Sequence, residues 1–260
     1  KGNTQETLTF NGFTNSNFNN AIAGVNVINA INSSNVVMNS SGGYELVSGS
    51  IAVDGTSSLD ISGVVQNQTS PSAAASSIQK TGAGTLTLSG PNTYSGGTSL
   101  NAGTIAVSNN TALGTGTLAM ATGTTLQAAS SVALANAVST TGIATVDTNG
   151  NNLGLSGIIS GAGALTKTGI GTATLSGANT YSGGTTVSAG TLAGNTTSLQ
   201  GNITNNAIVD FNQTTSGTYA GTMSGSGTLV KEGAGTLTLA GANTYSGGTT
   251  VAAGTLAGNA

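Results

Sequence analysis

One block of sequence occurs three times in this chain, and it constrains the fold more than any other feature. The copies begin at Lys80, Lys167 and Lys231 and align without gaps. The second and third copies agree at 24 of 29 positions, and the first and third at 20 of 29. Such self-similarity is typical of arrays in which each repeat packs on its neighbours. Similar residues upstream extend the units to about 51–108, 143–195 and 207–259.

The spacing of the copies suggests a chain that coils with a constant turn length. The offset from Lys80 to Lys167 is close to four times a length of about 21.5 residues, and the offset from Lys167 to Lys231 is close to three times that length. The segments between the copies nevertheless differ in length. We therefore expect each offset to be a whole number of turns.

Within each copy, apolar residues alternate with threonine. Leu86 and Leu88 alternate with Thr85 and Thr87, which is the period-two pattern of a half-buried strand. Threonine is β-branched and suits the outer surface of a sheet. Steps of Gly, Asn and Ser bound the short strands and permit tight turns.

Composition excludes the main alternatives. Gly, Thr, Ser and Asn make up more than half of the chain, only 4% of residues are charged, and the net charge is −3. The chain has too few charged residues to form the polar faces of a helical bundle. Its net charge is also too low for disorder caused by charge repulsion. The sequence predicts an all-β fold, a single right-handed parallel β-solenoid of about 12 turns. Its expected inward positions are Leu86, Leu88, Leu175, Val187, Leu192, Leu237, Leu239, Val251 and Leu256.

Two segments depart from the repeat pattern. Residues 1–50 are rich in Asn and are expected to form a cap or the first turns of the solenoid that occupies residues 51–260. Phe10, Phe13 and Phe18 in this segment form either that cap or a docking surface. The insertion from Gln66 to Ser77, with Pro71, is expected to loop out of the first unit.

Each copy also carries an Asn and a Tyr at fixed positions. We expect structural roles for both, with the Tyr packing at the edge of the core and the following Gly pair forming a corner. Stacking of the tyrosines on carbohydrate is the functional alternative, but residues three or four turns apart cannot form one aromatic platform. The residues are Asn92, Asn179, Asn243, Tyr94, Tyr181 and Tyr245.

The motif G-x-G-T-L-T-L-S-G-x-N-T-Y-S-G-G-T-T-V-x-x-G-T-L occurs at residues 82–105, 169–192 and 233–256. It resembles the passenger-associated transport repeat of bacterial autotransporters. The resemblance implies a surface-exposed or secreted β-helix of a Gram-negative bacterium, exported with an outer-membrane β-barrel translocator. It also implies an adhesin whose glycan or protein ligand the sequence does not identify. Because Lys1 opens no signal peptide, we expect a mature or excised piece.

The residues that most binding and catalytic chemistry requires are absent. The chain has no Arg, His, Cys or Trp, and three of its four lysines share one repeat position. We therefore expect no metal, no cofactor, no nucleic-acid partner and no insertion of this segment into a membrane. The close acidic pair, Asp54 and Asp60, is weak evidence for a polysaccharide-active enzyme, so the chain is predicted to be non-enzymatic.

Two non-enzymatic functions remain. One is the stalk or adhesin passenger of a surface protein, and the other is a filament subunit that stacks end to end on copies of itself. A solenoid presents an unpaired strand edge at each end, and residues 254–259 show no polar or helical cap. Negative-stain images would distinguish short rods from long fibres.

A last hypothesis concerns repeated charges. Asp147 precedes Lys167, and Asp210 precedes Lys231, by close to one turn. Residues one turn apart stack about 4.8 Å apart. These pairs, together with Asp54 and Lys80, are therefore candidates for vertical ion pairs on the surface of the rod. The alternative is that all six are solvated corner residues repeated by duplication.

Overall fold

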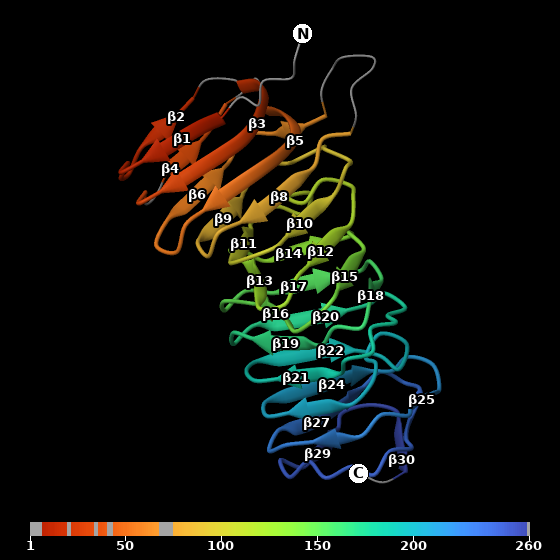
Figure 1. Cartoon of the computed structure of the whole chain (residues 1–260). Coiled ribbons are helices and arrows are strands. Elements are labelled where there is room, and N and C mark those ends of the chain that lie inside the picture. Colours follow the sequence, from red (N-terminus) through yellow and green to blue (C-terminus); the bar gives the residue numbers. More distant parts are fainter. Residues whose placement is uncertain (1–6, 20–21, 34–35, 41–43, 68–74, 259–260) are drawn as a thin grey trace.

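The structure is a computed structural model that describes residues 7–19, 22–33, 36–40, 44–67 and 75–258. Within these ranges it contains 30 short β-strands and no helix. The strands pair in parallel and stack along one axis, so that β1 and β30 lie at opposite ends of a rod (Figure 1). The longest sheet has 11 strands, which corresponds to about 11 turns and confirms the predicted β-solenoid within one turn.

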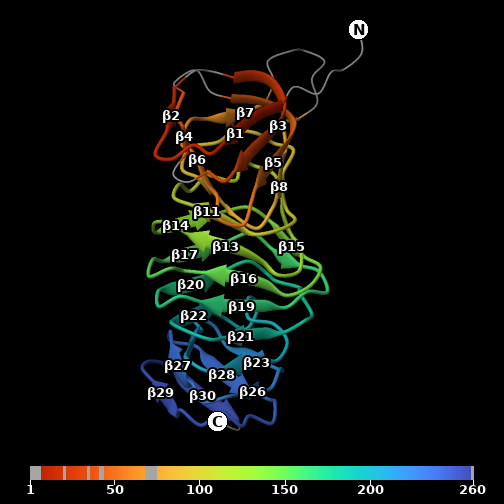
Figure 2. The ribbon, with the colours of Figure 1, turned by 60° about the vertical axis from the view of Figure 1, so that its left-hand side comes forward.

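Each regular turn contributes one strand position to each of three faces, which Figure 2 shows from a second side. The first face begins as a nine-stranded sheet. Its strands are β1 (Thr7–Asn11), β3 (Ile22–Ile31), β5 (Tyr44–Val53), β7 (Val65–Gln66), β8 (Ile78–Thr81), β10 (Thr98–Leu100), β12 (Leu118–Met120), β15 (Val138–Thr140) and β18 (Ile159–Ser160). Further along, the same place in the turn is taken by a three-stranded sheet of β25 (Gly217–Tyr219), β28 (Thr236–Leu239) and β30 (Thr255–Gly258).

The other two faces each form one continuous sheet. The second face consists of β2 (Asn17–Phe18), β4 (Val36–Met38), β6 (Ser58–Ile61), β9 (Thr85–Leu88), β11 (Thr104–Val107), β13 (Thr124–Ala128), β16 (Ala144–Asp147), β19 (Leu165–Thr168), β21 (Thr185–Val187), β23 (Ile203–Asn205) and β26 (Met223–Ser224). The third face consists of β14 (Val132–Leu134), β17 (Leu153–Leu155), β20 (Thr172–Leu175), β22 (Thr191–Gly194), β24 (Ile208–Asn212), β27 (Thr228–Glu232) and β29 (Thr249–Val251).

The strand register gives the length of a turn. On the first face Ile78 pairs with Thr98, and Thr98 with Leu118, so that one turn takes about 20 residues. From β9 onward the second face keeps nearly the same step, which is shortest between β21 and β23 and longest where β11 pairs with β13 and β16 with β19. The turn from β5 to β8 is longer, pairing Gly49 with Ile78, because it contains the predicted insertion. Residues 68–74 of that insertion lie outside the described residues.

The prediction that the repeats are spaced by whole turns is wrong. With turns of about 20 residues, the two offsets between the lysines exceed four and three whole turns, and the strand register moves each successive lysine on by one face. Lys80 therefore lies on the first face, Lys167 on the second and Lys231 on the third. The three faces use the same alternating strands and glycine corners, so a repeat can begin on any face.

The alternation of Leu and Thr places one side chain in the core and the next on the surface. Leu86 and Leu88 are fully buried, and seven of the nine predicted inward positions are buried. Val251 and Leu256 are not, because no further turn covers them within the described residues. On the outer surface of the second face, threonines at paired positions form a continuous column: Thr85, Thr104, Thr125, Thr145, Thr166, Thr186 and Thr204.

The N-terminal strands continue the stack on the first and second faces, with β1 paired to β3 and β2 paired to β4. Phe10 is buried, whereas Phe13 is 41% exposed. Phe18 is half-buried, and its ring centroid lies 4.6 Å from that of Phe10 and 5.5 Å from that of Phe13. The three rings gather at the N-terminal end of the core, and their role as a cap or as a docking surface stays a prediction.

Candidate functional site

Each of the three repeats opens with a lysine whose side chain lies inside the solenoid. Lys80, Lys167 and Lys231 are at most 1% exposed. The register explains this, because Lys167 pairs with Val146 on the turn before and with Val187 on the turn after, both of which point inward. The lysine therefore occupies a position where the alternation requires a core residue.

The ammonium group of each lysine is held by backbone carbonyls at two successive corners. Lys80 Nζ donates to the carbonyl oxygens of Thr81 (2.9 Å) and Gly82 (2.7 Å) at its own corner and of Ala102 (3.1 Å) one turn later. An ammonium has three donors, so this set satisfies it without a carboxylate. The equivalent bonds of Lys167 and Lys231 measure 2.6–3.1 Å, and Lys167 also donates to Thr148 Oγ1 at 3.0 Å.

Two glycines of the motif are required by this corner. Gly82 has a φ of 74°, a conformation that few other residues adopt. Gly103, at the next corner, has a φ of 69°, and a Cβ there would lie 2.6 Å from the carbonyl oxygens of Gly82 and Gly84. The glycines let two turns approach closely enough for one lysine to bind both.

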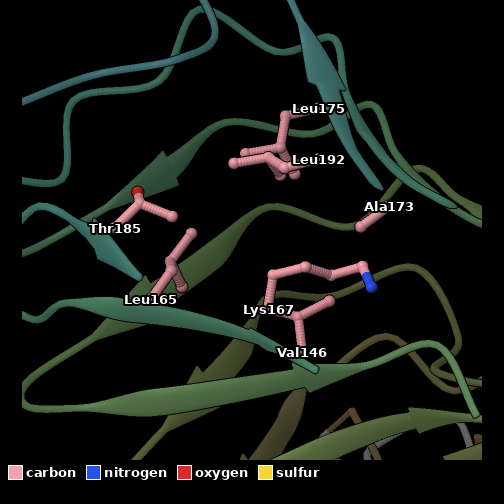
Figure 3. Close-up of a pocket in the computed structure, with 7 residues that line it drawn as sticks. All are labelled: Val146, Leu165, Lys167, Ala173, Leu175, Thr185 and Leu192. Carbon is pink, nitrogen blue, oxygen red and sulfur yellow. The ribbon is translucent and has the colours of Figure 1, made fainter. Parts of the chain in front are cut away.

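Burial affects the pKa of two of these lysines. It lowers the pKa of Lys80 and of Lys167 to about 8, and the carboxylate of Asp147 partly opposes this effect at Lys167. Both ammonium groups therefore remain largely protonated at neutral pH. Figure 3 shows Lys167 extended inside the core, with its nitrogen pointing away from Leu165. The cavity beside it is only about 10 Å³, too small for a ligand.

The hypothesis of vertical ion pairs is wrong. Asp147 is paired with Thr168 rather than with Lys167, and Asp210 with Val230 rather than with Lys231. This one-residue offset turns each lysine inward and leaves each aspartate pointing outward. The lysine nitrogens bind carbonyl groups instead, so the charges of the two residues interact only at longer range.

The predicted aspartates have separate environments. Asp54 accepts hydrogen bonds from Ser57 and from the backbone of Asn32, which lower its pKa. Asp147 accepts from Gln127 Nε2 at 2.8 Å. Among the residues that the structure describes, His, Cys, Asp and Glu form no group of three that could hold a metal ion.

The repeated asparagines link turns where the strand pairing is interrupted. Asn92 Oδ1 accepts from the backbone nitrogen of Val65 on the turn before (2.7 Å), and its Nδ2 donates to the carbonyl of Ala112 on the turn after (2.6 Å). Asn179 makes the same two bonds, to Ile159 and Ser198, each at 2.7 Å. Asn243 Oδ1 accepts from the backbone nitrogen of Met223 at 2.8 Å.

The repeated tyrosines point into the core rather than toward solvent. Tyr94 and Tyr181 are at most 2% exposed, and each hydroxyl lies within 2.8 Å of the Thr Oγ1 four residues later. Tyr245 makes the equivalent contact with Thr249 at 2.6 Å and is half-buried. These positions favour packing over stacking on a sugar, so the structural role of the six motif residues remains our interpretation.

Comparison with known proteins identifies the repeats. A family model described as the passenger-associated-transport-repeat matches residues 78–107, 165–193 and 229–257. The adhesin BmaC autotransporter of Brucella suis biovar 1 is 46% identical over 186 residues, which cover 69% of this chain. The chain belongs with the autotransporter passengers. Passengers of this class are secreted or displayed at the surface of Gram-negative bacteria.

The segment aligned with this chain spans 5% of the length of that adhesin, so the similarity concerns a small part of a much longer protein. No solved structure matches this chain. In the described ranges, no helix of the passenger is long and apolar enough to cross a membrane.

The three transport repeats of this passenger are rotated about its axis. Repeat one contributes β8 and β10 to the first face and β9 and β11 to the second. Repeat two begins one face later with β19, and repeat three one face later again with β27. Their lysine corners therefore point in three directions, and no single face of the rod collects the repeated residues.

Sequence reasoning missed one surface feature, a groove on the outside of the third face near Asp210. Its residues come from repeat two and from the segment that follows it, and only the register brings them together. Asp210 is one of the repeated charges of the sequence, but nothing in the sequence shows which outward residues lie beside it.

Proposed function

We propose that this chain is a non-enzymatic extracellular scaffold, a length of the stalk or adhesin passenger of a Gram-negative surface protein. The observation that carries the proposal is the single uninterrupted core from Phe10 to Leu239, reinforced at each repeat by a buried lysine corner. A rod of about 11 turns at about 4.8 Å per turn is about 50 Å long. Similarity to a protein named as an adhesin supports the same role.

Export in this proposal depends on an outer-membrane β-barrel translocator, the partner that autotransporter passengers share. A chain with 4% charged residues and no cysteine suits passage in an unfolded form. Parallel turns can then fold outside the cell one upon another, because each turn packs only on its neighbours.

Display on a Gram-negative host tests this function. The chain is fused to a heterologous translocator with an epitope tag at its N-terminus, and intact cells are treated with protease. We expect antibody to label the cells and the rod to resist cleavage, whereas a Leu86→Asp variant with a charged core should be degraded. Display of an unfolded, cleavable chain, or hydrolysis of polysaccharides by the purified chain, would contradict the proposal.

Assembly into filaments by end-to-end stacking is a second candidate, supported by the low charge of the chain, which leaves little repulsion between stacked solenoids. Sedimentation of the purified chain distinguishes the candidates, since a stalk segment gives monomers and a filament subunit gives concentration-dependent polymers.

A further inference from the structure

The corner between β16 and β17, near the middle of the rod, is a tight turn (Figure 1). Asn149 and Gly150 occupy its two central positions, with positive φ values of 47° and 81°. The backbone nitrogen of Asn151 donates to the carbonyl oxygen of Thr148 at 2.7 Å and closes the turn. These features define a type I′ turn, in which Asn followed by Gly is a favoured pair. The same pair is chemically reactive, because the side-chain amide of Asn and the backbone nitrogen of Gly can close a five-membered ring.

The groups that would react are accessible at this corner. Asn149 and Gly150 are both exposed. The backbone nitrogen of Asn149 donates to Asp147 Oδ1 at 2.9 Å. Among the described residues, however, neither the side-chain amide of Asn149 nor the nitrogen of Gly150 has a hydrogen-bond partner. Beyond its chain neighbours, a Cβ added at Gly150 would meet only Ile170 Cγ1, at 3.9 Å, so nothing crowds the approach of the two groups.

Rotation of one peptide group brings the reacting atoms together. In a type I′ turn, the nitrogen of the second central residue points away from the side chain of the first. Flipping the peptide between Asn149 and Gly150 converts the turn to type II′, in which φ stays positive at the first position and becomes negative at the second. Glycine adopts either sign of φ, and both turn types keep the hydrogen bond that closes the turn. The flip therefore places the Gly150 nitrogen beside the Asn149 side chain without breaking the corner.

We propose that Asn149 is a site of spontaneous covalent modification. The Gly150 nitrogen attacks Cγ of Asn149, the bond from Cγ to Nδ2 breaks, and the proton of the Gly150 nitrogen leaves with the released ammonia. Water then opens the resulting succinimide. Its addition at Cγ gives aspartate, and its addition at the backbone carbonyl carbon gives isoaspartate. The reaction needs no reagent other than water, and it goes beyond the scaffold role proposed above.

The chain contains one other Asn-Gly pair, and its structure protects it. Asn11 is the last residue of β1 and is paired with Ile31. The nitrogen of Gly12 donates to the carbonyl oxygen of Ile31 at 3.0 Å. Ring closure at Asn11 must first break this hydrogen bond and the end of the strand pairing. We therefore expect Asn11 to react at least about tenfold more slowly than Asn149 in the folded chain.

Formation of isoaspartate should loosen the lysine corner of repeat two. Isoaspartate adds one carbon to the backbone of the turn, but the next corner stacks closely on it, since a Cβ at Gly169 would lie 2.4 Å from the nitrogen of Asn149. Lys167 Nζ binds both corners, through Thr148 Oγ1 at 3.0 Å and the carbonyl oxygen of Gly169 at 2.8 Å. Separation of the two corners would release Lys167 and expose it to proteases.

Peptide mapping by tandem mass spectrometry tests the site. The purified chain is incubated at pH 8 and 37 °C, either folded or unfolded in guanidinium chloride, then quenched in acid and digested with pepsin. In the folded chain, Asn149 should convert at least about tenfold faster than Asn11. In guanidinium chloride the two rates should be similar, because Gly follows both residues. Conversion of Asn149 no faster than that of Asn11 in the folded chain would overturn the proposal.

Cleavage of the folded chain by trypsin tests the consequence. During incubation, the fraction of the parent chain cut after Lys167 should rise in step with the fraction of isoaspartate. Asn149→Gly is the matched control, because glycine accepts the positive φ but has no amide to react. Its cleavage should not change with incubation. An equal rise in both chains, or conversion of Asn149 without a rise in cleavage, would overturn the loosening of this corner. These measurements use the purified chain in solution, so failure here leaves the surface-display test unaffected.

Discussion

Repeats two and three have nearly the same sequence but different surroundings. They agree at 24 of 29 positions, yet Val187 in repeat two is fully buried while its equivalent, Val251, is 48% exposed. Tyr181 and Tyr245 differ in the same way. The difference arises because further turns follow repeat two, whereas β29 and β30 belong to the last described turn.

This comparison separates what a turn provides for itself from what its neighbour provides. The lysine corner is complete in both repeats, since Lys231 is fully buried and binds the carbonyl of Ala253 at 3.1 Å. The second half of the repeat is different, because its inward side chains need a following turn to cover them. Local sequence therefore sets the direction of a side chain, and stacking sets its burial.

The largest difference is expected for a charge at the inward valine. Val187→Asp should destabilise the chain by about 4 kcal/mol or more, because it buries an unpaired carboxylate. Val251→Asp should cost less than about 1 kcal/mol, because that position remains partly hydrated. Urea unfolding followed by circular dichroism measures both values. Equal losses would show that the last turn is covered in solution, for example by a second molecule.

At the corner glycines, in contrast to the inward valines, we expect equal losses of stability in repeats two and three. A Cβ at Gly190 or at Gly254 would lie 2.4 Å from a carbonyl oxygen of the corner before it, and φ is positive at both (65° and 71°). Gly190→Ala and Gly254→Ala should therefore both destabilise, by about 2–3 kcal/mol each. The same urea experiment applies. A much smaller loss at Gly254 would mean that the last turn is frayed rather than merely uncovered.

A third prediction concerns pH and the covered lysines. The pKa of Lys167 is about 8 in the folded chain, below the ordinary value of 10.5. Between these values the unfolded chain binds more protons, so folding stability rises with pH. We expect this lysine to contribute a gain of about 2 kcal/mol between pH 7 and pH 9.5.

Lys167→Met is the matched variant, since it keeps the length of the side chain and removes the titrating group. Its stability should rise less with pH than that of the parent chain, with Lys80 supplying the remaining gain. The measurement must stop below pH 10, because burial raises the pKa of Tyr94 and Tyr181, and ionisation in the unfolded state then reverses the trend. An unchanged pH dependence in Lys167→Met would contradict the assigned cause.

Much of this fold could be predicted from local patterns, because the alternation of Leu and Thr and the corner glycines act within one turn. The direction of Leu86 follows from its neighbours alone. The face on which each repeat lies could not be predicted, because the true turn is slightly shorter than the turn length inferred from the repeat spacing, and this shifts every stacked partner. The pairing of Lys167 with Asp147 failed for a different reason: the local turn places Thr168 beside Asp147, and a difference of one residue points a side chain to the other face. The residues of the groove also could not be predicted, because they meet only through the register of the third face.

The smallest effect is expected at the tyrosine hydroxyls. Tyr181→Phe removes a buried contact of 2.8 Å with Thr185 Oγ1 and leaves that hydroxyl in the core, at a cost of about 1 kcal/mol. Tyr245→Phe removes the equivalent contact with Thr249 at an exposed site, where water replaces it, so the cost should be only about 0.3 kcal/mol. Thermal unfolding of the two variants and of the double variant measures these values. A larger loss at Tyr245 than at Tyr181 would show that burial by the following turn does not control the strength of the contact.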